Sequence, residues 1–105
     1  MSNIGVWEPA EPGVRRKILT VGESIMNMVV EFEAGAEGYE HSHPHEQLTY
    51  VLSGSFEFRI GGEKRIVLAG ESIYIPSGVR HGVTALEAGA LHDAFTPVRE
   101  DLVKR

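Results

Sequence analysis

Three of the five histidines of the chain stand between His41 and His45, in the run His-Ser-His-Pro-His. On an extended strand, residues two apart point to the same face, so His41 and His43 can offer their imidazoles to one metal ion. Gln47 lies beyond the proline turn with the same parity as His43, and its amide oxygen can reach the same point. This spacing predicts a metal site that includes His41, His43 and Gln47.

A fourth ligand must come from elsewhere in the chain. His81 is the natural candidate because it follows the Pro-Ser-Gly turn at 76–78, which ends one predicted strand and directs the next, and His92 is the other option. The chain contains no Cys, which excludes disulfides, thiolate zinc sites, iron–sulfur clusters and Cys nucleophiles. Imidazole and amide ligands suit Ni, Zn, Fe, Mn and Co about equally, so the spacing predicts one divalent ion without selecting it.

Short β-strands must position these side chains. In residues 24–33, the apolar side chains recur at every second position, the period of a half-buried strand. The runs at 48–52 and 56–60 alternate in the same way, and Gly61-Gly62 is typical of a two-residue hairpin turn. Further strands are expected at 65–68, 72–75, 82–86 and 91–95, with a short turn at 97–102. This spacing predicts an all-β sandwich or barrel.

Length and composition set the broader class. We expect the 105 residues to form a single domain, with 1–13 as an extended N-terminal arm. Fifteen acidic against ten basic residues give a formal charge of -5, which disfavours nucleic acid as a partner. The sequence shows no apolar leader or membrane-length segment, so we expect a cytoplasmic protein without a membrane partner.

Residues 35–54 and 70–81 resemble the two motifs of the cupin family. The first motif reads Gly, five residues, His-x-His, three or four residues, Glu, six residues, Gly. The chain fills it with Gly35, His41, His43, Gln47 and Gly54. The second motif reads Gly, five residues, Pro-x-Gly, two residues, His, three residues, Asn. The chain fills it with Gly70, Pro76, Gly78, His81 and Ala85. Gln47 and Ala85 depart from the pattern.

The cupin resemblance implies a double-stranded β-helix, or jelly-roll, barrel with a metal ion in its mouth. Its ligands would be His41, His43, Gln47 and His81. Because Gln47 replaces an acidic ligand, four neutral ligands would leave the charge of the ion unneutralised and the site more Lewis-acidic. The resemblance gives His45 a supporting or exposed role.

The tail of the chain is similar to the pectin-degradation cupins known as KdgF. In that family a run of Asp-x-Phe-Ser/Thr-Pro-x-Arg-Glu-Asp follows the last barrel strand, and here the run extends from Asp93 to Asp101. The His-Ser-His-Pro-His-Glu-Gln run is also similar. The resemblance implies an enzyme that converts 4,5-unsaturated galacturonate or related uronates from pectin and alginate breakdown into linear 4-deoxy-5-keto uronates.

Within this resemblance, Asp93 takes the place of the catalytic Asp, and Phe95 that of the aromatic residue beside it. Opening the cyclic enol ether needs water delivered across the C4–C5 double bond and proton transfers, which a carboxylate near a metal can mediate. Asp93 and Phe95 share strand parity, so both face the cavity if one does. Arg99 is expected to bind the substrate carboxylate through a bidentate contact.

Two other functions are compatible with the same residues. One is a metal-dependent cupin dioxygenase, which oxygen uptake with iron or copper would reveal. The other is a non-catalytic cupin that binds or senses a sugar acid and releases it unchanged. An Asp beside the metal favours the enzyme. We expect a small-molecule sugar acid as ligand and a homodimer, because exposed sheet edges invite pairing between copies.

Overall fold

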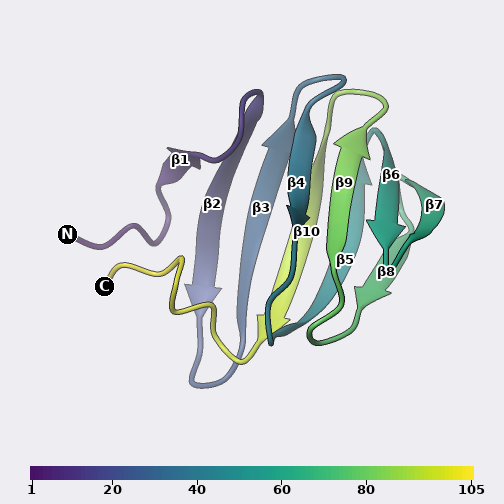
Figure 1. Ribbon diagram of the computed structural model, residues 1–105. Coiled ribbons are helices and arrows are strands. Elements are labelled where there is room, and N and C mark those ends of the chain that lie inside the picture. The colour runs from purple at the N-terminus through teal and green to yellow at the C-terminus, as the bar shows by residue number, and fades with distance from the viewer.

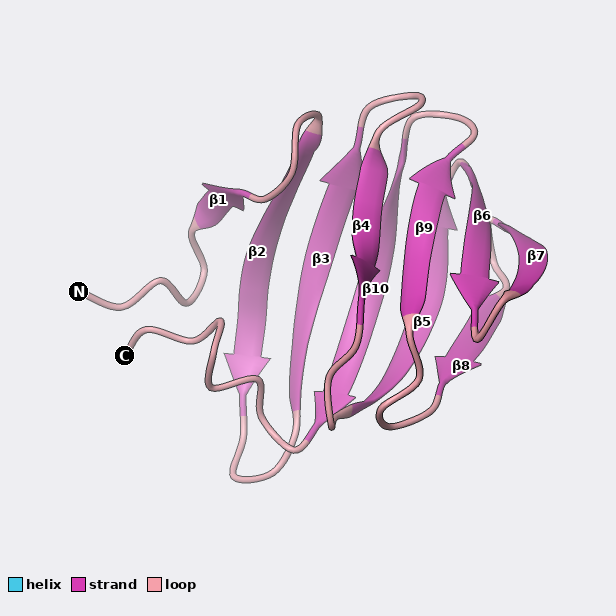
Figure 2. Cartoon of the chain, in the orientation of Figure 1, coloured by secondary structure: helices cyan, strands magenta, loops and turns pink.

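Residues 1–105 are all described by the computed structural model, and they form ten strands in two antiparallel sheets (Figure 1). The strand order of the six-stranded sheet is β1 (Trp7–Pro9), β2 (Val14–Val21), β3 (Met26–Phe32), β10 (Gly89–Thr96), β5 (Glu46–Ser53) and β8 (Ser72–Ile75). The four-stranded sheet has the order β4 (Glu37–His41), β9 (His81–Ala85), β6 (Ser55–Ile60) and β7 (Glu63–Leu68). The smaller sheet lies in front of the larger one, and all other segments are loops (Figure 2). The predicted all-β jelly-roll is confirmed.

The hydrophobic core fills the space between the two sheets. Alternate residues of β3 are buried, as the period of two predicts. The rings of Phe32 in β3 and Phe56 in β6 meet edge to face with their centroids 5.2 Å apart. Because one face of each sheet is covered in this way, inward positions are fixed by strand parity, and an inward polar side chain must have a partner or a function.

The structure confirms the predicted strands from β3 to β10, except β4, and the hairpin at Gly61-Gly62, whose φ angles are +55° and +86°. The sequence did not predict β1, β2 or β4. β4 reads Glu-Gly-Tyr-Glu-His and has no aliphatic residue to mark an inner face. In β2 an inward arginine interrupts the apolar alternation between Val14 and Ile18. The segment at 97–102 forms a turn, closed by a bond from Leu102 N to Arg99 O at 2.9 Å.

The two ends of the chain lie side by side at one end of the molecule (Figure 1). The N–H of Asn3 donates to Lys104 O at 2.9 Å, and the N–H of Lys104 donates to Asn3 Oδ1 at 2.8 Å. Within the predicted arm, residues 1–13, β1 pairs with β2 of the same chain. These contacts fix the C-terminal segment against the barrel. The chain has no helix with the length and hydrophobicity of a membrane crossing.

Candidate metal centre

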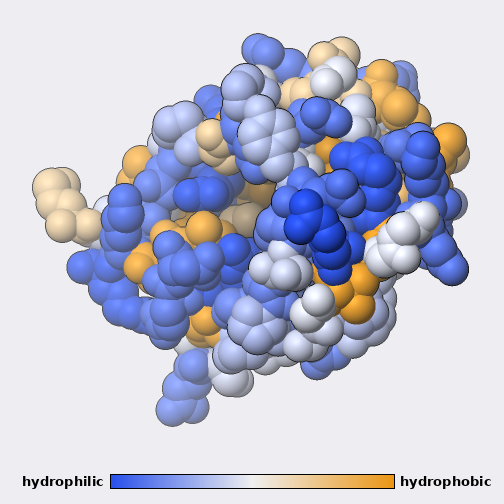
Figure 3. Space-filling view, in the orientation of Figure 1, coloured by the Kyte–Doolittle hydropathy of each residue, from blue (hydrophilic) through white to orange (hydrophobic).

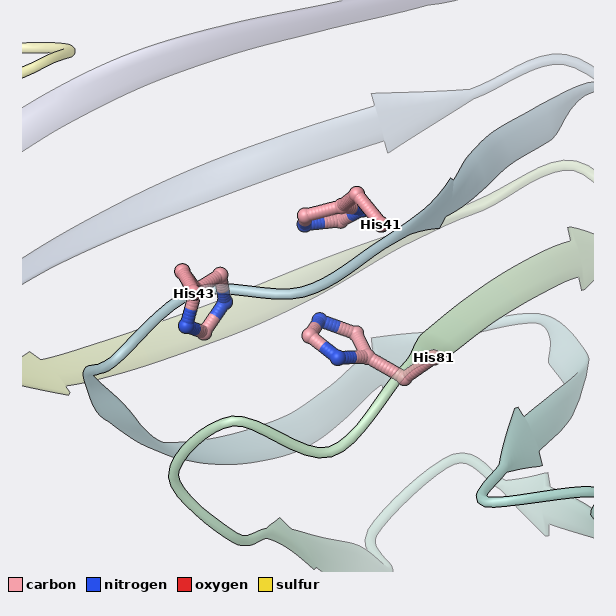
Figure 4. Close-up of side chains that lie close together, drawn as sticks. All are labelled: His41, His43 and His81. Carbon is pink, nitrogen blue, oxygen red and sulfur yellow. The ribbon is translucent and has the colours of Figure 1, made fainter.

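The side chains of three histidines lie close together and point toward one another (Figure 4). His41 ends β4 and faces His81 at the start of β9 in the register of the two strands, and His43 follows in the next loop. One ring nitrogen from each histidine lies within 4.8 Å of the others. The ring centroids of His41 and His43 lie 4.4 and 4.9 Å from that of His81. The structure therefore brings together the three histidines that the sequence singled out.

Main-chain carbonyls orient the three rings. His41 Nδ1 lies 2.8 Å from Tyr39 O, and His81 Nδ1 lies 2.9 Å from Val79 O. His43 Nδ1 lies 3.1 Å from the carbonyl oxygen of residue 45. A carbonyl oxygen only accepts, so Nδ1 carries the proton in each ring. Each Nε2 is left with its lone pair, the form in which imidazole binds a metal.

The unsatisfied atoms of this cluster fit a divalent cation. His81 Nε2 is buried and has no hydrogen-bond partner, an arrangement that costs free energy unless a ligand satisfies it. Burial lowers the pKa of His81 to about 4. Burial, together with the charge of Arg99, also lowers the pKa of His43. Both rings are therefore neutral near pH 7, as metal ligands must be.

Gln47 supplies a fourth donor to the same cluster. It is buried in β5, and its Oε1 lies 3.1 Å from His43 Nε2. Its Nε2 donates to Thr49 Oγ1 at 3.0 Å, and the Thr49 hydroxyl donates to Asp93 Oδ1 at 2.6 Å. This chain of bonds directs the amide oxygen toward His43 Nε2, so two acceptors face each other. Two acceptors at this distance repel unless a cation lies beside them, which again fits a metal.

Thr49 is a residue that the sequence reading missed. Its only signal is its place two residues after Gln47, on the same inward face of β5. The Thr49 hydroxyl accepts a hydrogen bond from Gln47 and donates one to Asp93, so it connects the candidate metal donors to the acidic group.

Asp93 and Phe95 both face the barrel interior from β10, as their shared parity predicts. Burial raises the pKa of the Asp93 carboxyl, while hydrogen bonds from Thr49 and Gln47 oppose that rise. Phe95 packs edge to face against His43, with 5.7 Å between the ring centroids. A carboxyl group with a raised pKa beside a group of metal-donor side chains is suited to proton transfer.

Arg99 lies beside these residues but has a partner that the sequence did not reveal. Its guanidinium lies over the Phe95 ring, 5.1 Å from the centroid. Nε and Nη2 donate to the two carboxylate oxygens of Asp101 at 3.0 and 2.8 Å. The bidentate face predicted to bind a substrate is thus occupied by Asp101, and only Nη1 has no hydrogen-bond partner.

The other two histidines lie outside the cluster. His92 Nε2 is 3.0 Å from the side-chain nitrogen of Asn27, which belongs to the outward-facing residues of β3, so His92 is removed from the alternatives for the fourth ligand. His45 Nε2 lies 3.2 Å from Val98 O, which ties the loop before β5 to the C-terminal segment. The main-chain oxygen of His45 orients the ring of His43.

A cavity of about 280 Å³ gives access to the cluster. Its polar lining includes His41, His81, Gln47, Asp93 and Arg99, and its apolar lining includes Met28, Val30, Phe32, Phe58, Leu91 and Phe95. On this side the surface is largely hydrophilic, with apolar side chains visible between the β1–β2 side and the β4–β9 side (Figure 3). The cavity therefore combines metal donors, a buried acid and an apolar wall, the composition of a small-molecule site.

Comparisons with known proteins identify the family of the chain. A model of the cupin domain matches residues 28–92. The pectin degradation protein KdgF of Dickeya dadantii is 42% identical over 99 residues, which cover 92% of this chain and 90% of that protein. The structure of KdgF from a Halomonas species has a TM-score of 0.87 and 39% identity, and the match covers 91% of this chain and 89% of that chain.

An RmlC-like cupin from Shewanella frigidimarina is similarly close, with a TM-score of 0.88 and 37% identity over 92% of this chain and 87% of that chain. The similarity in sequence and fold extends along nearly the whole chain. This chain therefore belongs to the cupins and, among them, to the KdgF family.

Proposed function

We propose that the chain is a metal-dependent enzyme that linearises 4,5-unsaturated uronates, such as unsaturated galacturonate, to 4-deoxy-5-keto uronates during pectin or alginate breakdown. The observation that carries the proposal is the hydrogen-bonded path from the metal donors through Gln47 and Thr49 to the buried Asp93. The names of the relatives, pectin degradation protein KdgF and KdgF, support the substrate class.

In this proposal His41, His43, Gln47 and His81 would hold one divalent ion. Such an ion supplies Lewis-acid polarisation of a substrate oxygen, and four neutral ligands leave its charge unneutralised. The imidazoles are held by main-chain carbonyls and the amide by Thr49, so the donors need no rearrangement to bind.

Asp93 moves the protons of the reaction. Water adds across the double bond, with its oxygen forming a bond to C5 and a proton forming a bond to C4. The bond between C5 and the ring oxygen then breaks as the ring oxygen gains the proton lost by the C5 hydroxyl, which leaves a ketone at C5 and a hydrated aldehyde at C1 that releases one water molecule. The raised pKa of Asp93 favours the acid form that donates to C4, and the resulting carboxylate takes the proton lost by the attacking water.

The neighbours of Asp93 orient the substrate and exclude bulk water. Phe95 forms part of the apolar wall, and the free Nη1 of Arg99 can donate to a substrate oxygen. Because Asp101 holds the guanidinium of Arg99 in place, that nitrogen is preorganised.

The first test is turnover of unsaturated galacturonate generated with a pectin lyase-type enzyme. We expect metal-loaded protein to accelerate the loss of the ultraviolet absorbance of the C4–C5 double bond, because linearisation removes that conjugated bond. The control is the same protein after chelation, at matched concentration. Decay equal to this control would reject the proposed reaction. In that case, oxygen uptake with iron or copper would indicate a dioxygenase, and recovery of unchanged ligand would indicate a binding protein.

The proposal includes a homodimer formed through the outer face of the six-stranded sheet. On β5 the outward residues Leu48, Tyr50 and Leu52 are 58%, 44% and 47% exposed, and Tyr74 of β8 pairs with Leu48 in the register. Outward positions of a solvated sheet are usually polar, whereas a contiguous apolar face marks an interface. A second copy presents the same face, as a two-fold symmetric contact requires.

We expect wild-type protein to have the mass of a dimer at micromolar concentration, and Leu48→Asp to have that of a monomer, because a charge would be buried in the contact. Light scattering with size-exclusion chromatography measures this difference. Leu86→Asp is the matched control, since Leu86 is 48% exposed in the loop after β9, away from this face. A monomeric wild type, or a dimeric Leu48→Asp variant, would contradict the proposed interface.

A further inference from the structure

Strand β2 carries three basic residues in a row, Arg15, Arg16 and Lys17, and only the two outward ones have partners. Arg15 forms an ion pair with Glu31, with 2.6 Å between Nη2 and Oε1, and its guanidinium lies 4.2 Å from the ring centroid of Trp7. The ammonium of Lys17 lies 4.9 Å from the same centroid. These two side chains are engaged on the outer face of the sheet.

Arg16 points to the opposite face and lines the cavity of the metal centre. Its neighbours in parity, Val14 and Ile18, are both buried in the core. Arg16 Nε is buried and has no hydrogen-bond partner. A buried guanidinium nitrogen without a partner costs free energy, and a bound anion removes that cost.

Two acidic side chains near Arg16, those of Glu8 and Glu11, have other partners. Glu8 faces Arg16 from β1 in the register, but its Oε1 accepts a hydrogen bond from Asn3 Nδ2 at 2.9 Å. Glu11 lines the same cavity, and its Oε1 accepts from the N–H of Tyr39 at 3.3 Å. Neither carboxylate comes within 4.0 Å of the Arg16 guanidinium. Arg16 is therefore a cavity cation whose bidentate face is free.

The register of the sheet places Arg16 at the end of the cavity away from the metal donors. In β10, Phe95 pairs with Gln47 of β5, Asp93 comes two residues before Phe95, and Leu91 comes two residues before Asp93. Leu91 pairs with the same residue of β3 as Arg16 does, so Leu91 and Arg16 lie in one row across the sheet. Successive inward residues of a strand are about 6.6 Å apart. Asp93 therefore lies between the row that contains the metal donor Gln47 and the row that contains Arg16.

We infer that Arg16 binds the carboxylate of the substrate and thereby fixes its direction in the cavity. This inference rests on the proposed function. A uronate held in this way directs its hydroxyl groups toward His41, His81 and Gln47. The carbon that carries the carboxylate is C5, so C4 beside it lies in the row of Asp93, where the proton is needed. Arg99 cannot bind the carboxylate through both Nη nitrogens, because its Nε and Nη2 already donate to Asp101.

The test compares Arg16→Gln with Arg15→Gln, which removes the same charge from the neighbouring outward position. For Arg16→Gln, we expect the KM for unsaturated galacturonate to rise about 10- to 100-fold, the effect of losing a charge-assisted pair, while kcat changes much less. Arg16→Lys should recover part of the loss, and Arg15→Gln should leave both constants unchanged. Metal content and melting temperature establish that each variant is loaded and folded.

Binding of saturated galacturonate and of its methyl ester gives a readout that does not depend on turnover. By calorimetry, metal-loaded wild type should bind the acid about 10- to 100-fold more tightly than the ester, and Arg16→Gln should bind both equally weakly. Equal binding of acid and ester by wild type, or an unchanged KM in Arg16→Gln, would overturn the role of Arg16. If wild type shows no turnover while Arg16→Gln still loses acid binding, the proposed reaction fails and Arg16 remains the carboxylate-binding residue.

Discussion

We expect replacement of His43 with Ala to remove the bound divalent metal and to abolish turnover. His43 contacts four other residues of the proposed site, since its Nε2 faces Gln47 and its ring packs against those of His41, His81 and Phe95. Without it, three donors remain, one of them a neutral amide. Changes in groups that only orient metal ligands already weaken metal affinity about 10- to 100-fold, so loss of a ligand should cost at least that much.

Metal content after dialysis, measured by elemental analysis, checks this result. His92→Gln is the matched control because His92 lies on the outward face of β10 and outside the cluster, so its metal content should equal that of wild type. Retention of one metal ion per chain by His43→Ala would show that the ligand set is wrong.

We expect Asp93→Asn to keep the metal and the fold but to lower kcat by roughly 10²- to 10⁴-fold, the usual contribution of one general acid or base. The amide has nearly the shape of the carboxyl group, and its oxygen can still accept the hydrogen bond of Thr49. It cannot donate a proton to carbon and recover one from water. Steady-state kinetics on unsaturated galacturonate measure the loss, and a kcat like that of wild type would remove Asp93 from the catalytic role.

Thermal melting of the metal-free proteins distinguishes a chemical effect of Asp93→Asn from structural damage. Burial raises the pKa of Asp93 in the folded chain above its unfolded value of about 3.9. The contribution of the neutral Asp93 carboxyl to the free energy of unfolding is therefore fully present below about pH 3.9, and it is lost as the pH rises through the pKa of Asp93 in the folded chain. Asn does not ionise, so Asp93→Asn should melt a few degrees higher than wild type at pH 8. The difference should narrow toward pH 4, and a lower melting point at pH 8 would instead indicate structural damage.

Strand parity predicted most of the fold and the clustering of the histidines. Alternation in β3 and β5 defined the inward faces, and the spacing of His41, His43 and Gln47 predicted that these three donors lie together, as they do. Parity is local, so it could not choose between His81 and His92. That choice depends on the pairing of β9 with β4, which places His81 opposite His41.

Other parts of the site depend on contacts that no local pattern carries. Three consecutive basic residues in β2 give no local signal of burial, and only the sheet shows that Arg16 points inward. The pairing of Arg99 with Asp101 depends on the turn after β10, where a residue two positions away competes for the guanidinium. Thr49 connects Gln47 to Asp93 only because the sheet places it beside Asp93.

The main-chain carbonyls that hold the three histidines have a consequence for how the site can change in evolution. Every residue type offers the same carbonyl oxygen, so the side chains at Tyr39 and Val79 can be exchanged without turning the rings of His41 and His81. Metal geometry is thus separated from the identity of its nearest neighbours. Tyr39 also lines the cavity, so a substitution there can alter the shape of the cavity without turning the rings that would hold the metal.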